Sequence, residues 1–116
     1  RPGSESFGRA FEHFILQETR AYSLYSRKEF PITYWRSASG MEVDMILGAG
    51  EAAIEIKSTR SATAAHTRGL RAVQTEIRPR RRFLVTCDQR PRMLQDGIQV
   101  LPWNDYCRQL WAGEIV

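Results

Sequence analysis

Two acidic residues and one lysine in the first half of the chain have the types and the spacing that phosphate chemistry requires. Asp44 lies in the segment 41–48, and Glu55 and Lys57 lie in the segment 52–58. Both segments are short and alternate apolar with polar residues, and a glycine-containing turn separates them, which predicts two neighbouring strands. Side chains two residues apart share one face of a strand, so Glu55 and Lys57 are expected on the same face.

The turn between these segments sets their pairing. If residues 49–50 form a two-residue loop, Asp44 faces Glu55 and Glu42 faces Lys57. Directly opposed Cβ atoms lie roughly 4.5–5.5 Å apart. Two carboxylates at that separation repel each other unless they share a proton or a cation, so strand pairing alone gives no reason to place them there.

Oxygen ligands of this kind suit Mg²⁺ or Mn²⁺, which take one or two protein carboxylates and keep several waters. Such a cation activates water and neutralises charge on a scissile phosphate, and Lys57 could position the water or steady the phosphate. Two alternatives stay open. The charged residues could form a salt-bridged sheet face open to solvent, and Glu42 could either pair with Lys57 or complete a carboxylate cluster.

The surrounding pattern predicts the elements that position these residues. Phe7, Phe11 and Phe14 repeat at helical spacing within residues 4–25, and Pro31 separates this helix from the next segment. Regular alternation along 41–48 would place Met41, Val43, Met45 and Leu47 on one side of a strand, with Glu42, Asp44 and Ile46 on the other. The expected helices are 4–25, 62–77 and one after Pro102, and the expected strands are 32–37, 41–48, 52–58, 82–86 and 98–101.

This order, α-β-β-β-α-β-β-α, predicts an α/β sandwich around a mixed sheet, with an antiparallel three-stranded meander flanked by helices. The last helix carries Trp103, Tyr106, Leu110 and Trp111, which we interpret as core residues.

Asp44, followed after eleven residues by Glu55-Ile56-Lys57, resembles the PD-(D/E)xK signature of the restriction-endonuclease-like nucleases, with Val43 in place of the proline. The expected layout is also similar to that superfamily. The resemblance implies that Asp44 and Glu55 bind a metal and act in catalysis together with Lys57. It also implies that Glu12 on the first helix supports the metal, although a solvent-facing helix glutamate is the alternative.

A second resemblance covers nearly the whole chain. Its motifs look like the C-terminal uncharacterised domain of prokaryotic AAA-type ATPases, in which an ATPase module precedes a nuclease-like domain. They are Gly8-Arg9-Ala10-Phe11-Glu12, Tyr34-Trp35-Arg36-Ser37, Gly40-Met41-Glu42-Val43-Asp44, Ile54-Glu55-Ile56-Lys57-Ser58 and Leu101-Pro102-Trp103. The chain starts at Arg1 and has no phosphate-binding loop, so residues 1–116 are expected to be one nuclease-like domain of a longer protein. ATP would bind only to the missing N-terminal module.

Basic charge is concentrated in the second half of the chain. Residues 1–58 hold seven Lys or Arg and eight Asp or Glu, whereas residues 59–116 hold ten and five, which is compatible with a nucleic-acid partner. A soluble surface without a polyanion partner is the alternative. The candidate nucleic-acid contacts are Arg36, Arg60, Arg68, Arg80 and Arg81; the last two belong to the run 78–82, which is also typical of a solvated loop.

Length and composition limit the classes of protein. A chain of 116 residues allows one domain, and no apolar run approaches the ~18–20 residues of a membrane span. Cys87 and Cys107 cannot form a disulfide framework and indicate a reducing compartment, so we expect a cytoplasmic protein. His13 and His66 lack partners at metal-binding spacing, and nothing local demands a role for Gln74.

Three hypotheses result from these patterns. The first is a metal-dependent nuclease that hydrolyses DNA or RNA phosphodiesters. It could act as a homodimer, as many nucleases that cut both strands do. The second is a catalytically silent binding or regulatory module of an AAA-type ATPase. The third is a nucleic-acid binder without chemistry, carried by the arginine-rich half.

Overall fold

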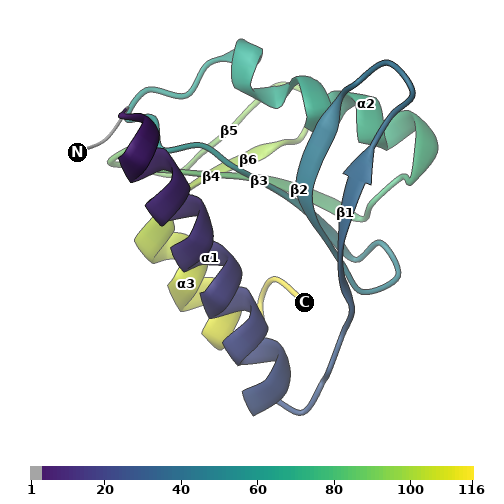
Figure 1. Cartoon of the computed structure of the whole chain (residues 1–116), viewed down its shortest axis with the longest axis vertical. Coiled ribbons are helices and arrows are strands. Elements are labelled where there is room, and N and C mark those ends of the chain that lie inside the picture. Colours follow the sequence, from purple (N-terminus) through teal and green to yellow (C-terminus); the bar gives the residue numbers. More distant parts are fainter. Residues whose placement is uncertain (1–3) are drawn as a thin grey trace.

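The structure is a computed structural model that describes residues 4–116. Its elements confirm the predicted α/β class and run from an N-terminal helix through a meander to a C-terminal helix (Figure 1). They are α1 (Glu5–Tyr25), β1 (Ile32–Arg36), β2 (Glu42–Leu47), β3 (Ala52–Ile56), the 3₁₀ helix η1 (Ala64–Thr67), α2 (Arg68–Glu76), β4 (Arg81–Thr86), β5 (Arg92–Met93), β6 (Gln99–Pro102) and α3 (Trp103–Trp111). Within residues 4–116, no helix combines the length and the hydropathy that crossing a membrane requires.

Six strands of the described chain form one mixed sheet in the order β1-β2-β3-β4-β6-β5. β1, β2 and β3 form the predicted antiparallel meander, and β3, β4 and β6 are parallel neighbours. The short strand β5 pairs antiparallel with β6 at the far edge. The meander therefore joins a parallel unit through β3, the strand that carries Glu55.

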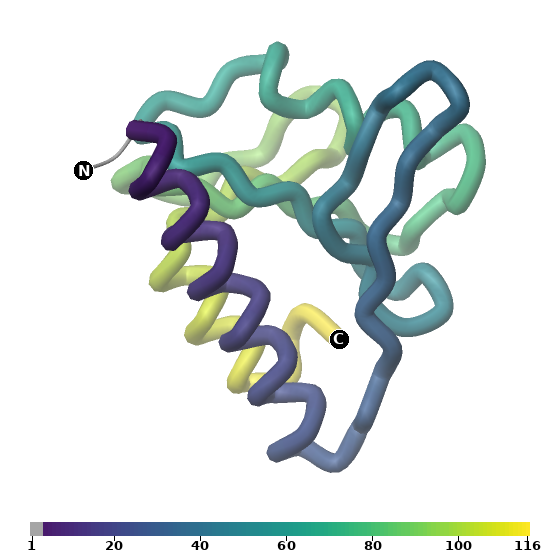
Figure 2. The backbone as a smooth tube through the Cα atoms, viewed as in Figure 1, coloured from purple at the N-terminus to yellow at the C-terminus, as the bar shows by residue number. Residues whose placement is uncertain are grey.

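Helices cover both faces of this sheet. α1 and α3 lie side by side on one face, and α2 lies on the other, as the backbone trace shows (Figure 2). Two buried clusters result, one under each layer. Under α1 and α3 the cluster includes Ile15, Met45, Ile54, Phe83 and Tyr106, and under α2 it includes Val43, Ile46, Leu70, Val73 and Leu84.

The N-terminal helix forms as its sequence predicts. The side chain of Ser4 accepts a hydrogen bond from the backbone N–H of Phe7, which caps the first turn. Ile15 and Phe11 lie on the buried face, whereas Phe14 is 42% exposed. The phenylalanine stripe therefore packs only partly into the core, and its outer edge remains on the surface.

Three expectations need correction. The predicted helix 62–77 starts as η1 and becomes α-helical only at Arg68. The sheet also contains β5, a strand that was not predicted because its two residues are too few to show an alternating pattern. In α3, Tyr106 and Leu110 are buried as expected, but Trp103 and Trp111 are 43% and 42% exposed and are not core residues.

Candidate active site

β2 and β3 pair in the predicted register, but their ladder ends just before the acidic residues. Met45 lies opposite Ile54, and the remaining pairs continue toward the turn in the same register. The next predicted pair, Asp44 with Glu55, and the one after it, Glu42 with Lys57, lie beyond the last ladder pair. The two strands thus form a fork that opens at Asp44.

At this fork, side-chain carboxyl groups replace backbone carbonyl groups as hydrogen-bond acceptors between the two strands. The backbone N–H of Asp44 donates to Oε1 of Glu55 at 3.1 Å, and the backbone N–H of Ile56 donates to Oδ2 of Asp44 at 2.7 Å. Each carboxyl group therefore satisfies an amide of the opposite strand. The fork is held open by these two reciprocal hydrogen bonds, and the two carboxyl groups are held next to each other.

A β-bulge in β2 sets the direction of Asp44. Trp35 pairs with Val43, whereas Thr33 pairs with Ile46, so β2 contains one more residue than β1 between these pairs. The expected regular alternation is therefore wrong. Val43 packs with Ile46 under α2, and Met45 packs on the other face, because the extra residue shifts the phase of the strand at Asp44.

Glu55 is a buried acid with an unusual protonation equilibrium. Glu55 is 8% exposed, and burial is the largest of several effects that together raise its pKa from the ordinary 4.5 to about 8. The charge of Asp44 and a hydrogen bond between the two carboxyl groups contribute to this rise, while Lys57 and the hydrogen bond from the Asp44 backbone oppose it. The Nζ atom of Lys57 lies 3.6 Å from Oε2 of Glu55, and its side chain is 45% exposed. The site therefore combines the buried carboxyl group of Glu55 with the ammonium group of Lys57, which reaches solvent.

Two more glutamates extend this acidic region. Burial raises the pKa of Glu12 on α1, and the charges of Asp44 and Glu42 add to the rise, whereas Lys57 lowers it. The structure thus brings Glu12 into the electrostatic field of the pair. Glu42 does not pair with Lys57 but accepts a hydrogen bond from the hydroxyl of Tyr34, whose pKa is raised by this bond.

The donor atoms fit a hard divalent cation. Asp44 and Glu55 contribute only oxygen, and each uses one carboxyl oxygen on a backbone N–H. A cation between them would replace the proton that burial holds on the pair. Among residues 4–116, no three or more His, Cys, Asp or Glu side chains are grouped to hold a metal ion. Two carboxylates nevertheless match the one or two that Mg²⁺ takes from a protein.

The predicted arginines are divided between two ends of the sheet. Arg36 ends β1 in register with Glu42, Arg68 begins α2, and Arg60 lies in the loop after β3; all three are exposed. Arg80 and Arg81 lie at the opposite end of β4, about five strand residues, or roughly 16 Å, from its end near Lys57. The Arg81 guanidinium stacks on the ring of Phe83 and donates to the carbonyl of Glu114.

Three other residues named in the sequence analysis lie on the helices. His13 and Gln74 are exposed on their helices. His66 accepts a hydrogen bond from the backbone N–H of Thr63 at 2.9 Å and so stabilises the start of η1. Tyr34, to which the sequence pattern assigned no role in the site, lies opposite the bulge and contacts Glu42. The position of Tyr34 in the aromatic-rich strand β1, which neighbours the acidic strand β2, is the signal that could have indicated this contact.

Comparison with known proteins gives one match. Searches of curated proteins and of solved structures returned no match. The sequence profile of one family, described as a domain of unknown function (DUF4143), matches residues 7–106, which include the whole meander, the fork and most of α1. The chain therefore belongs to the DUF4143 family.

Proposed function

We propose that this domain is a nuclease that hydrolyses nucleic-acid phosphodiesters with the help of Mg²⁺ or Mn²⁺. The observation that carries the proposal is the buried Glu55 carboxyl group, held beside Asp44 and 3.6 Å from the ammonium group of Lys57. A carboxyl group with a raised pKa next to a second carboxyl and a lysine is typical of a catalytic site. The resemblance of these residues to the PD-(D/E)xK signature points to the same chemistry.

Each residue has a role that its surroundings support. Asp44 and Glu55 would hold the cation, and their hydrogen bonds to the backbone would keep both carboxyl groups from rotating away. Glu12 would support the site from α1 through its charge. A bound cation would polarise the phosphate and activate a water. Lys57 would steady the negative charge that develops on the phosphate, because its ammonium group reaches solvent beside Glu55.

Calorimetry with Mn²⁺ tests the metal site directly. We expect the wild-type domain to bind Mn²⁺ and the Asp44→Asn variant to lose this binding. The variant keeps a side-chain oxygen that can accept the Ile56 N–H, so the fork should keep its structure. Asp96→Asn is a matched control, since Asp96 pairs with Arg71 on another part of the surface. Equal Mn²⁺ affinity in the wild type and in Asp44→Asn would contradict the proposed site.

Cleavage is tested with the protein in its full length. We expect Asp44→Asn and Lys57→Ala to abolish hydrolysis of DNA or RNA while circular dichroism shows that both variants keep the wild-type secondary structure. If the purified variants cleave at the wild-type rate, the assigned roles are wrong.

One observation favours a second candidate function. The carboxyl groups of Asp44 and Glu55 complete the strand fork through backbone hydrogen bonds, a structural role that needs no metal. A silent binding or regulatory module of an AAA-type ATPase could keep them for this reason. Such a module would bind the ATPase portion with an affinity that Asp44→Asn leaves unchanged, measured by calorimetry, and it would bind no Mn²⁺.

A further inference from the structure

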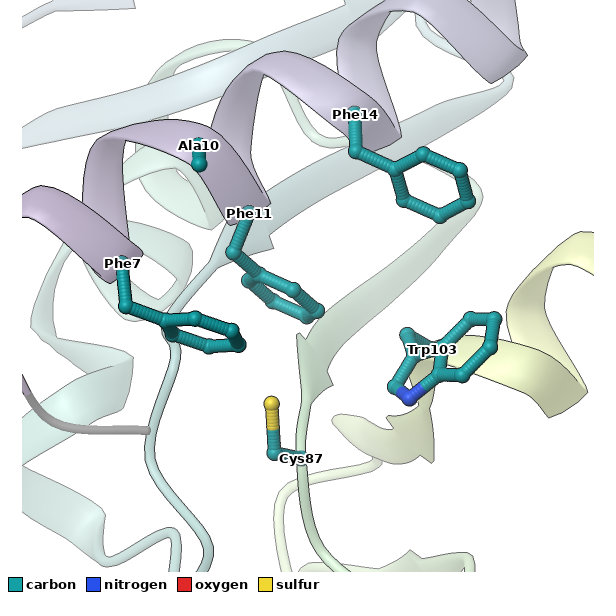
Figure 3. Close-up of a pocket in the computed structure, with 6 residues that line it drawn as sticks. All are labelled: Phe7, Ala10, Phe11, Phe14, Cys87 and Trp103. Carbon is teal, nitrogen blue, oxygen red and sulfur yellow. The ribbon is translucent and has the colours of Figure 1, made fainter. Parts of the chain in front are cut away.

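An aromatic pocket opens between the start of α1, the start of α3 and the end of β4. Its volume is about 330 Å³, and its lining is almost entirely apolar: Phe7, Ala10, Phe11, Phe14, Cys87 and Trp103. The phenylalanine side chains and the Trp103 indole extend into one space above the Cys87 thiol (Figure 3). Phe14 and Trp103 meet edge to face with ring centroids 5.8 Å apart, and both are more than 40% exposed.

A second pocket adjoins the first and differs from it in chemistry. It has a volume of about 510 Å³ and is lined by Arg60, Cys87, Asp88, Gln89, Arg90 and Arg92. Cys87 lines both pockets, so they meet at this residue. We call the two together the aromatic–arginine groove.

The polar half of this groove carries excess positive charge. Its acid, Asp88, is already engaged: it lies 3.7 Å from Arg92 and accepts hydrogen bonds from Ala62 and Thr86. In the part of the chain that the structure describes, neither Arg60 nor Arg90 forms an ion pair, and both are exposed. Two guanidinium groups are thus available to an anion.

An aromatic pocket that continues into a cationic one matches the two parts of a nucleotide. Bases stack on aromatic rings, each for about 1–3 kcal/mol, and phosphates pair with arginine. We infer that the aromatic–arginine groove binds single-stranded nucleic acid, with an unpaired base in the pocket of Phe14 and Trp103 and the neighbouring phosphates on Arg60 and Arg90. A base held in a duplex cannot enter this pocket, so the groove should prefer single strands.

The groove begins beside the candidate active site. The chain continues from Lys57 to Thr59, whose carbonyl accepts a hydrogen bond from the Cys87 N–H at 2.8 Å. On α1, Phe11 lines the groove, and the next residue, Glu12, lies in the field of Asp44. The inference rests on the proposed function in one respect: the bound strand would be the substrate of that site. Binding itself needs no chemistry and can be tested separately.

Fluorescence anisotropy in EDTA tests the groove with labelled oligothymidine, labelled oligouridine and a duplex of equal length. We expect both single strands to bind more tightly than the duplex; the two strands show whether the groove prefers DNA or RNA. Trp103→Ala should weaken binding by about 10-fold, within the range for one stacked base. Trp111→Ala is the matched control, since Trp111 is equally exposed at the other end of α3, against Tyr22, and should leave affinity unchanged.

The arginines are tested by salt dependence. Replacing Arg60 and Arg90 by Gln should lower the slope of log affinity against log salt by about 0.7 for each arginine–phosphate pair that the substitution removes. Arg20→Gln, on the exposed face of α1, should leave the slope unchanged. A bound strand should also slow alkylation of Cys87, while Cys107 on α3 serves as the internal reference.

Several results would overturn the inference: no binding of single strands, equal binding of the duplex, or equal losses in Trp103→Ala and Trp111→Ala. Loss of association with the ATPase portion in Trp103→Ala, without oligonucleotide binding, would make the groove a protein interface instead. These failures are separable from failure of the proposed function. Cleavage that depends on Asp44 but not on Trp103 would sustain the nuclease and reject the groove.

Discussion

The buried acid Glu55 should make the stability of the metal-free domain depend on pH. An unfolded chain releases this proton near 4.5, whereas the folded state holds it up to about 8. Between these values the folded state binds one more proton than the unfolded state. The free energy of unfolding therefore falls as the pH rises through this window, and the contribution of Glu55 is flat above it.

The size of the effect comes from the same values. Each pH unit inside the window is worth about 1.4 kcal/mol, so the change from about pH 5 to about pH 8 is about 4 kcal/mol. The Glu55→Gln variant removes the ionisation but keeps an oxygen that can accept the Asp44 N–H. We therefore expect the variant to lose this part of the pH dependence.

Urea unfolding in EDTA, followed by circular dichroism at several pH values, measures the difference between wild type and Glu55→Gln. The difference should change by about 4 kcal/mol across the window, in favour of the variant at high pH. Asp44→Asn should give an intermediate profile, because Asp44 supplies part of the rise in the pKa of Glu55. Parallel profiles for wild type and Glu55→Gln would refute the reasoning that Glu55 is protonated when the fold is intact at neutral pH.

Two further pairs of variants test close contacts between the packed elements. A Cβ on Gly69 would lie 1.8 Å from the carbonyl oxygen of Glu42, so Gly69→Ala should destabilise the domain by about 1–3 kcal/mol. A Cβ on Gly8 would have its nearest neighbour at 3.4 Å, so Gly8→Ala should instead stabilise α1 by about 0.5–1 kcal/mol. Urea unfolding measures both changes, and equal effects of the two substitutions would contradict the contact between Gly69 and Glu42. The buried hydroxyls of Thr19 and Tyr106 lie 2.8 Å apart, and Thr19 donates to the carbonyl of Ile15. Thr19→Val leaves the tyrosine hydroxyl without its acceptor and should lower the free energy of unfolding by about 1–3 kcal/mol, which is more than Tyr106→Phe should lower it. A larger loss in Tyr106→Phe would show that another group accepts the hydrogen bond of the tyrosine hydroxyl in Thr19→Val.

The features that sequence predicted well are those that neighbouring residues determine. The glycine-containing turn after β2 predicts the register of β2 and β3, and the observed pairs confirm it. The long helix α1 has a strong apolar period and a serine cap, and its observed bounds confirm the prediction closely. The predicted bounds of the three meander strands agree with the observed ones within one or two residues.

The features that sequence missed depend on partners distant in the chain. The bulge at Asp44 is a property of the pairing between β1 and β2, so the alternation of β2 alone could not reveal it. The exposure of Trp103 depends on the packing of α3 against α1. The roles of Asp44, Glu55, Lys57 and Glu12 remain predictions, although the structure shows the first three in contact at the fork.

The reciprocal hydrogen bonds of the fork have a spectroscopic consequence. The amide proton of Asp44 is bound to the carboxyl group of Glu55, and the amide proton of Ile56 is bound to the carboxyl group of Asp44. An amide proton shifts downfield when its acceptor becomes charged, because a carboxylate polarises the N–H bond more strongly than a neutral acid. The amide proton resonances of Asp44 and Ile56 therefore report the charge of two separate side chains. Their chemical shifts can be used to follow the binding of protons and cations at the fork.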